Sequence, residues 1–229
     1  MTTPDHPLDR PVWSALTTGQ AALAIGDHRA MRFDPDYGLF AAAADASSSS
    51  QAALAALVPD EGALALVETE APPTMPGVAI ELLAAWQMTA QRLTPAAACG
   101  FTITALDEAD APQMLDLATL TKPGPFFRYT HRLGDFIGVK DEAGRLVAMA
   151  GERMKPAGFT EVSGVCTHPD FRGRGYAGGL MRVVAAGILA RGETPFLHVY
   201  ASNNGAIALY ESLGFNLRRP MTIAVLARG

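Results

Sequence analysis

Residues 161–177 read EVSGVCTHPDFRGRGYA, and this stretch decides the fold that we expect. A strand is predicted over 160–167, and apolar side chains recur at helical spacing over 176–190. Between the two elements, Arg172, Gly173, Arg174 and Gly175 directly precede the helix. Free backbone N–H groups and the helix dipole favour an anion there, and glycines let the backbone approach it closely. Two guanidinium groups add charge and forked donors, so the stretch predicts a pyrophosphate site.

The same glycines allow two other interpretations. Gly173, Gly175 and Gly178 form a G-x-G-x-x-G, the fingerprint of dinucleotide-binding folds. Three features count against that fold: five residues separate the strand from the first glycine, the candidate acid Glu193 precedes the next strand instead of ending it, and little chain follows. A glycine-rich turn with solvated arginines is the other interpretation.

A second stretch lies downstream at residues 197–215, LHVYASNNGAIALYESLGF. It predicts a strand over 195–200 and a helix over 205–213, which Gly214 ends. Together with residues 165–177, this pattern resembles the GCN5-related N-acetyltransferase (GNAT) superfamily, and within it the FR47-like branch. The resemblance covers about residues 101–226 and rests on two separated motifs at the right spacing.

The resemblance implies a fold and an activity. The expected fold is α/β (α+β): a mixed, mostly antiparallel central sheet that is splayed at the cofactor site, with flanking helices. The expected activity transfers an acetyl or short acyl group from acetyl-CoA to a primary amine of a small molecule or amino acid, in a ternary complex. No metal is expected.

The resemblance also assigns roles to residues that would bind coenzyme A. The strand edge at Val165, Cys166 and Thr167 should hold the pantetheine arm, and Asn203 and Ala206 should line its thiol side. The pyrophosphate should contact the backbone of Arg172, Gly173, Arg174, Gly175, Tyr176 and Ala177.

Two residues match catalytic positions of the family. Tyr210 matches the residue that protonates the leaving thiolate, although it could also be a core tyrosine. Glu161 falls where some members carry a general base, which it could be if burial raises its pKa; it could equally pair with an arginine. Phe126 and Phe127 follow a Pro-Gly-Pro loop that could border the acceptor, or they could simply anchor that loop.

Cys166 and His168 alternate on the predicted strand, which allows a thiol nucleophile or a metal pair. A small buried cysteine and a loop histidine are the simpler interpretation. The remaining histidines show no ligand spacing, so the sequence predicts no metal site.

Composition narrows the class of protein further. The chain has 229 residues, of which 49% are hydrophobic and 18% charged, enough for a substantial core. The formal charge is −5, which argues against a nucleic-acid binder. Residues 1–99 hold four Arg, no Lys and eleven acidic residues, whereas residues 100–229 carry a balance of +2, which makes the second half the better host for an anion.

Two cysteines are too few for a disulfide framework, so a cytoplasmic protein is expected. The sequence shows no secretory signal, and no apolar run reaches the 18 or so residues of a membrane span. The oligomeric state and the identity of the acceptor stay open.

The first hundred residues are patterned more weakly. We expect an N-terminal α/β region over 1–98, for which a degenerate GNAT-like half is one hypothesis, and the acyltransferase domain over 99–229. Helices are predicted at 12–25 and 51–58, and strands at 30–33 and 63–67. Residues 78–91 favour a helix over a strand at their end, and residues 93–100 are the candidate linker.

The second half is patterned more clearly. We expect a strand at 101–105, a helix that opens at 107–111, a hairpin of strands 136–140 and 146–154, and a final strand at 221–226. Two functional alternatives remain open: a coenzyme A-binding sensor without turnover, and an acetyltransferase that acts on protein lysines or N-termini.

Overall fold

The computed structural model describes residues 6–95 and 99–229, and two β-sheets organise them. The larger sheet has eight strands in the order β4-β11-β5-β10-β9-β8-β7-β6, and the smaller has the order β1-β2-β3. The strands are β1 (Ala24–Gly26), β2 (Ala30–Phe33), β3 (Ala41–Ala43), β4 (Leu64–Glu68), β5 (Val78–Thr89), β6 (Thr104–Leu106), β7 (Phe136–Lys140), β8 (Leu146–Glu152), β9 (Phe159–Thr167), β10 (Thr194–Tyr200) and β11 (Asn216–Arg228). The α-helices are α1 (Pro11–Thr17), α2 (Ser48–Leu57), α3 (Ala111–Thr121), α4 (Tyr176–Ala190) and α5 (Asn204–Leu213).

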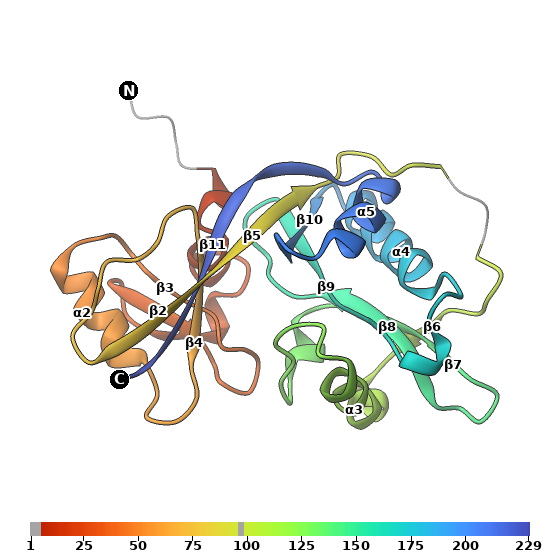
Figure 1. Ribbon diagram of the computed structural model, residues 1–229, viewed down its shortest axis with the longest axis horizontal. Helices are drawn as coiled ribbons and strands as arrows, with labels where there is room; N and C mark the ends of the chain where they lie inside the picture. Colours follow the sequence, from red (N-terminus) through yellow and green to blue (C-terminus); the bar gives the residue numbers. More distant parts are fainter. Residues whose placement is uncertain (1–5, 96–98) are drawn as a thin grey trace.

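The molecule has two lobes joined by the long strands β5 and β11, which run diagonally from one lobe to the other (Figure 1). One lobe holds β1–β4 with α2, and the other holds β6–β10 with α3, α4 and α5. All pairings in the large sheet are antiparallel except that of β9 with β10. The expected mixed, mostly antiparallel sheet with flanking helices is therefore confirmed.

The strand order is nearly symmetric about β5 and β11. In the C-terminal half, helix α4 connects the parallel strands β9 and β10. In the N-terminal half, helix α2 connects β3 to β4, and a parallel bridge between Phe40 and Ala65 joins their two sheets. Each half also pairs with a strand from the other half of the sequence: β4 pairs with β11, and β10 pairs with β5. The sheet thus crosses the boundary expected at residues 98 and 99. The expected linker includes residues 96–98, which lie outside the described residues.

The prediction of a helix at the end of residues 78–91 is wrong, because this segment is strand β5. Its alanines, leucines, glutamine and methionine favour a helix in isolation. In the structure β5 pairs with β11 along its whole length and with β10 over 85–89, so pairing on both sides overrides the local preference.

The helix predicted at 12–25 is also shorter than expected. It ends at Thr17, and residues 24–26 form β1 instead. Gly19 follows the end of the helix, and a Cβ at that position would lie 2.8 Å from the carbonyl oxygen of Lys155. The close approach of these two backbones therefore favours glycine here.

Helices α3 and α4 cover opposite faces of the sheet at β8 and β9. Ala148 and Ala150 of β8 belong to the apolar cluster that holds Leu180 and Ile188 of α4. Met149, between them, points the other way and packs with α3. This arrangement fixes the N-terminus of α4 against the end of β9. No helix among residues 6–95 and 99–229 is long and apolar enough to cross a membrane.

Candidate active site

The site begins where strands β9 and β10 separate. Their parallel pairing covers only three residue pairs and ends at Glu161 and Phe196. Beyond this point β9 continues to pair with β8 on its other side, where Cys166 opposes Met149. Among the described residues, the edge of β9 that faces β10 therefore has no strand partner over residues 165–167. An edge of this kind offers backbone donors and acceptors to a ligand with amide groups.

Gly164 shapes the end of β9 and requires its residue type. Its φ is +63°, and a Cβ there would lie 2.8 Å from the ring of Phe136. The register of β9 against β8 shifts at this point, which marks a bulge. The bulge turns residues 165–167 along the opening between β9 and β10.

The loop before α4 presents backbone donors to the same opening. Gly173 and Gly175 both have φ of +77°, a conformation that L side chains rarely adopt. Within the described residues, the backbone N–H groups of residues 173–175 have no backbone acceptor. The first-turn N–H groups of α4 add to these donors. Arg172 and Arg174 are exposed, and neither makes an ion pair with a described carboxylate.

These parts surround one large cavity of about 830 Å³. Every residue predicted to bind the cofactor lines it: Val165, Cys166, Thr167, Arg172, Gly173, Arg174, Gly175, Tyr176, Ala177, Asn203 and Ala206. Asn203 also caps α5, because its side chain accepts a hydrogen bond from the N–H of Ala206 at 3.2 Å. The large cavity therefore brings together two motifs that are separated in the sequence by most of α4 and by β10.

Sequence reasoning missed several residues of the large cavity. Lys122 ends α3 with φ of +50° and adds a third cation beside the two arginines. Gly124, Tyr200 and Leu209 also line the wall. The proline-glycine loop at 123–125 signalled a turn, but no local pattern indicated that the turn reaches β9.

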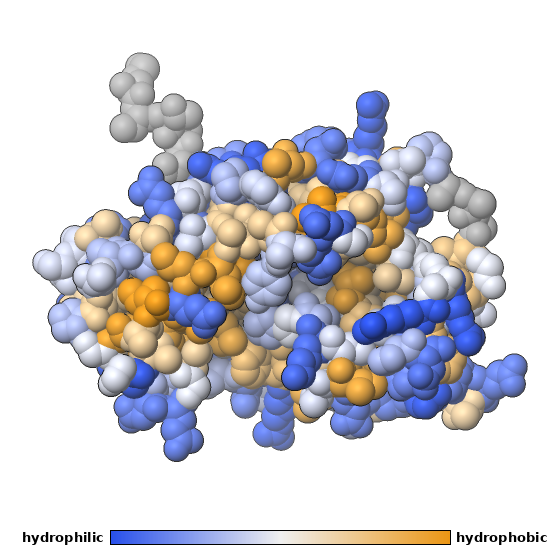
Figure 2. All heavy atoms as spheres, viewed as in Figure 1, coloured by the Kyte–Doolittle hydropathy of each residue, from blue (hydrophilic) through white to orange (hydrophobic). Residues whose placement is uncertain are grey.

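A small cavity of about 260 Å³ adjoins the large one. The two share five lining residues: Pro123, Gly124, Tyr200, Asn203 and Tyr210. The rest of the small cavity comes from both lobes, from Leu39, Phe40, Ala65, Val67, Pro125, Arg153, His198, Val199, Ile223 and Val225. Figure 2 shows apolar side chains gathered over the crossing of β4, β5 and β11 on the face in view.

Tyr210 stands at the junction of the two cavities. Its hydroxyl makes no hydrogen bond to any described residue, and burial raises the pKa of the phenol. The group therefore keeps its proton at neutral pH and can donate it to an atom held at the junction.

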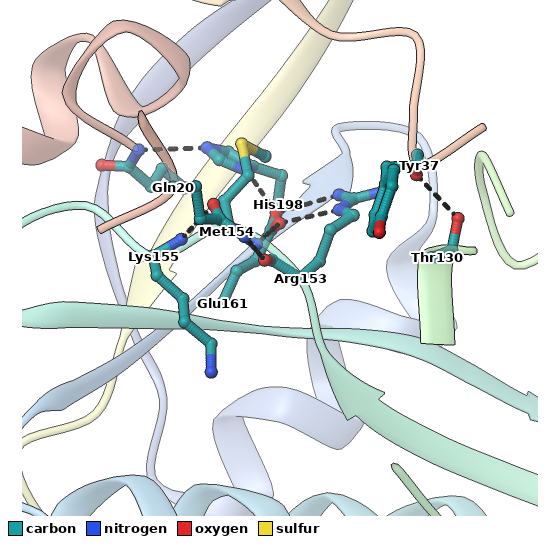
Figure 3. Close-up of polar contacts among 9 residues, drawn as sticks. Gln20, Tyr37, Thr130, Arg153, Met154, Lys155, Glu161 and His198 are labelled. Carbon is teal, nitrogen blue, oxygen red and sulfur yellow. Dashed lines mark hydrogen bonds and ion pairs between the residues drawn. The ribbon is translucent and has the colours of Figure 1, made fainter. Parts of the chain in front are cut away.

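Glu161 is held differently from what a general base requires. Its carboxylate is buried, and both oxygens accept hydrogen bonds from Arg153, at 2.8 and 3.0 Å (Figure 3). Burial by itself would raise the pKa of Glu161, but the charge of Arg153 and the hydrogen bonds from His198 and Arg153 lower it to about 2. The raised pKa that a general base at Glu161 would need is therefore not found, the alternative of a pair with an arginine is what the structure shows, and Glu161 lines neither cavity.

His198 lies on the other side of this carboxylate, with Nδ1 2.8 Å from Glu161 Oε1 (Figure 3). An ionised carboxylate only accepts hydrogen bonds, so Nδ1 donates. Nε2 then accepts from the Gln87 side chain at 3.0 Å. Both nitrogens of His198 are thus engaged.

The remaining candidates lie at the margins. Phe126 packs edge-on against Phe136, and Phe127 donates its N–H to Thr130; neither lines a cavity, whereas the three residues before them do. Burial raises the pKa of the Cys166 thiol to about 11, which keeps it a neutral thiol. Across the part of the chain that the structure describes, no cluster of His, Cys, Asp or Glu could hold a metal ion.

A GNAT-family protein from Novosphingobium aromaticivorans, known from its crystal structure, is 48% identical to this chain. The similarity covers 98% of this chain and 100% of that one, with a TM-score of 0.91. The chain belongs to the GNAT family.

Further matches agree with this GNAT assignment. The model of the FR47-like proteins matches residues 137–223. A GCN5-related N-acetyltransferase from Kribbella flavida is 18% identical over 94% of each chain, with a TM-score of 0.64, and shares the fold. No curated protein matches the sequence. GNAT proteins use acetyl-CoA, and membership supports an acetyltransferase activity in general.

Proposed function

We propose that this GNAT protein transfers an acetyl group from acetyl-CoA to a primary amine of a small molecule or amino acid, by direct attack in a ternary complex. The observation that carries the proposal is Tyr210, a protonated phenol at the place where the large cavity meets the small one. A donor in one cavity and an acceptor in the other would react beside it.

The large cavity fits acetyl-CoA by the chemistry of its walls. Diphosphate suits the N–H groups of residues 173–177 together with Arg172, Arg174 and Lys122. The amides of the pantetheine arm suit the unpaired edge of β9 at residues 165–167. When bound, the thioester supplies an electrophilic acyl carbon.

Two proton movements are needed, and the chain supports one directly. Tyr210 donates a proton to the leaving sulfur; burial raises the pKa of this phenol, so the group is protonated at neutral pH when the sulfur leaves. The attacking amine must lose a proton, but the low pKa of Glu161 and the engaged nitrogens of His198 make both poor acceptors. We therefore propose that Glu161 positions Arg153 and His198, and that the amine loses its proton through water.

We further propose that residues 1–98 are a degenerate GNAT-like half and that residues 99–229 carry the chemistry. The near-symmetric strand order supports the first point. The N-terminus of α2, which corresponds to that of α4, is capped by Ser47, whose hydroxyl in turn bonds to Asp45 at 2.5 Å. A carboxylate in this place disfavours a bound phosphate, so only one half would hold a nucleotide.

We also propose that the protein works in the cytoplasm without nucleic-acid or membrane partners. Support comes from two free cysteines, Cys99 and Cys166, and from the acidic net charge of −5.

The proposal is tested by calorimetry with coenzyme A and by thiol release in the presence of acetyl-CoA and an amine panel. Tyr210→Phe should bind coenzyme A within about twofold of the wild type and release thiol about 100-fold more slowly, the typical effect of losing a general acid. Unchanged turnover would remove Tyr210 from the mechanism. Binding without turnover on any amine would favour a coenzyme A sensor, and no binding would refute the proposal.

A further inference from the structure

The small cavity differs sharply in character from the large one. Its walls beyond the shared junction are mainly apolar, with Val67 of β4 and Ile223 and Val225 of β11 facing Pro125 and Phe40. The cross-strand pairs Val67–Ile223 and Ala65–Val225 put these β4 and β11 side chains on one sheet face. A volume of about 260 Å³ lies just below the roughly 300–1,000 Å³ of drug-sized sites, which indicates a compact ligand.

Among the described residues that line the small cavity beyond the shared junction, only Arg153 carries a permanent charge. Its Nε and Nη2 bind Glu161, whereas Nη1 has no hydrogen-bond partner among the described residues. The guanidinium carbon lies 4.5 Å from the ring centre of Phe40, which fixes the plane of the group. A guanidinium held in this way leaves Nη1 free to donate a hydrogen bond to a ligand oxygen in a mainly apolar cavity.

The charges of the cavity exclude one class of acceptor. Asp and Glu are absent from the described residues that line it, so a second ammonium group would enter without a counter-ion. Glu161 lies behind Arg153 and is already bound to it. Desolvating an unpaired ammonium is costly, and the adjacent guanidinium would repel it. Polyamines and aminosugars with several amines therefore do not suit this cavity.

Resting on the function proposed above, we infer that the acceptor is a compact monoamine with an apolar body and a carboxylate or carbonyl oxygen, which Arg153 Nη1 binds. The amine lies at the junction beside Tyr210, and the apolar body lies between β4, β11 and Pro125. Apolar amino acids and their amides are members of this class.

The test compares four acceptors with the wild-type protein at saturating acetyl-CoA: phenylalanine, phenylalaninamide, 2-phenylethylamine and spermidine. Rates are corrected for the neutral fraction of each amine. Phenylalanine or phenylalaninamide should exceed 2-phenylethylamine by about 10- to 100-fold in kcat/KM, the value of one charge-assisted hydrogen bond. All three should exceed spermidine. The ratio of acid to amide tells which oxygen Arg153 prefers.

Ile223→Glu places a carboxylate on the wall of the small cavity and should narrow the preference for phenylalanine over spermidine by about 100-fold, with phenylalanine about tenfold worse and spermidine about tenfold better. The matched control is Leu82→Glu, which adds the same charge to the neighbouring strand at an exposed position that lines neither cavity. The control should keep the wild-type preference. Thermal unfolding of both variants checks their folding.

Two results would overturn the inference. Wild-type protein that prefers spermidine, or that uses 2-phenylethylamine as well as the two oxygen-bearing acceptors, refutes it while leaving the acetyltransferase proposal intact. If coenzyme A binds but no amine turns over, calorimetry with phenylalaninamide in the presence of coenzyme A tests the inference. Binding of phenylalaninamide that Ile223→Glu weakens supports the small cavity as the acceptor site. The absence of binding refutes the inference.

Discussion

Glu161 is a candidate catalytic base from its position in the sequence, but its contacts in the structure are those of an ion-pair partner. On the strand it lies six residues before the proposed pantetheine edge ends, where a base would be useful. In the structure its carboxylate is sealed between Arg153 and His198, and neither cavity reaches it. A buried ion pair of this kind fixes the orientation of the Arg153 guanidinium, because the bidentate contact with Glu161 allows only one.

Glu161→Gln should lower the free energy of unfolding at pH 7 by about 3–5 kcal/mol, because it leaves Arg153 without a counter-ion in a nearly buried place. The loss should depend on pH. The pKa of Glu161 is about 2 in the folded protein and 4.5 ordinarily, so between these values the unfolded state binds more protons. The stability of the wild type therefore falls as pH falls from about 4.5 towards 2.

Urea unfolding of both proteins at several pH values measures this effect. The gap between wild type and Glu161→Gln should shrink as the pH is lowered through that window. Glu211→Gln, at an exposed position on α5, is the control and should show no such narrowing. A gap that stays constant down to pH 3 would contradict the assigned ionisation.

The N-terminus of α4 is the element on which the proposed binding of coenzyme A depends. The left-handed glycines 173 and 175 turn the chain so that successive N–H groups face the large cavity, and the packed face of α4 holds this turn against β8 and β9.

Strand β5 is an element whose local sequence favours a different structure from the one it adopts. Its helical propensity was overridden because two strands, both distant in sequence, pair with it.

Replacing Arg172 and Arg174 together by alanine should weaken coenzyme A about tenfold or more, because two charge-assisted contacts to phosphate are lost. Pantetheine, which lacks the phosphates, should bind within twofold of its wild-type affinity. Calorimetry with both ligands measures the difference. Added salt should reproduce the effect in the wild type, weakening coenzyme A only. Equal weakening of the two ligands by the double variant would place the phosphates elsewhere.

At the scale of the whole molecule, the two lobes depend on each other through exchanged strands. Strand β5 precedes residue 98 yet separates β10 from β11, and β11 closes the chain yet pairs with β4 of the first lobe. The small cavity depends on the same exchange, since its walls include β4, β10 and β11. The proposed acceptor site would therefore require both lobes.

A fragment of residues 99–229 should therefore fail to fold alone. Without β5, strands β10 and β11 lose the partner between them and expose apolar edges, which favours aggregation. Co-expression with residues 1–95 should restore a soluble complex that binds coenzyme A. Size-exclusion chromatography and thermal unfolding of each sample test this expectation. Cooperative unfolding of the isolated fragment would show that residues 99–229 form an independent domain.

The sequence by itself determined the family and which residues are proposed to bind the cofactor. The arginine-glycine loop, the strand before it and the Asn203–Tyr210 segment are local signals, because backbone conformation, helix capping and phosphate binding depend on neighbouring residues. Tertiary structure alone decided the rest: that β5 is an inner strand, that Glu161 is an ion-pair partner with a low pKa, and that the small cavity lies between lobes. Each of these depends on contacts between segments far apart in the chain, on which local propensity and periodicity carry no information.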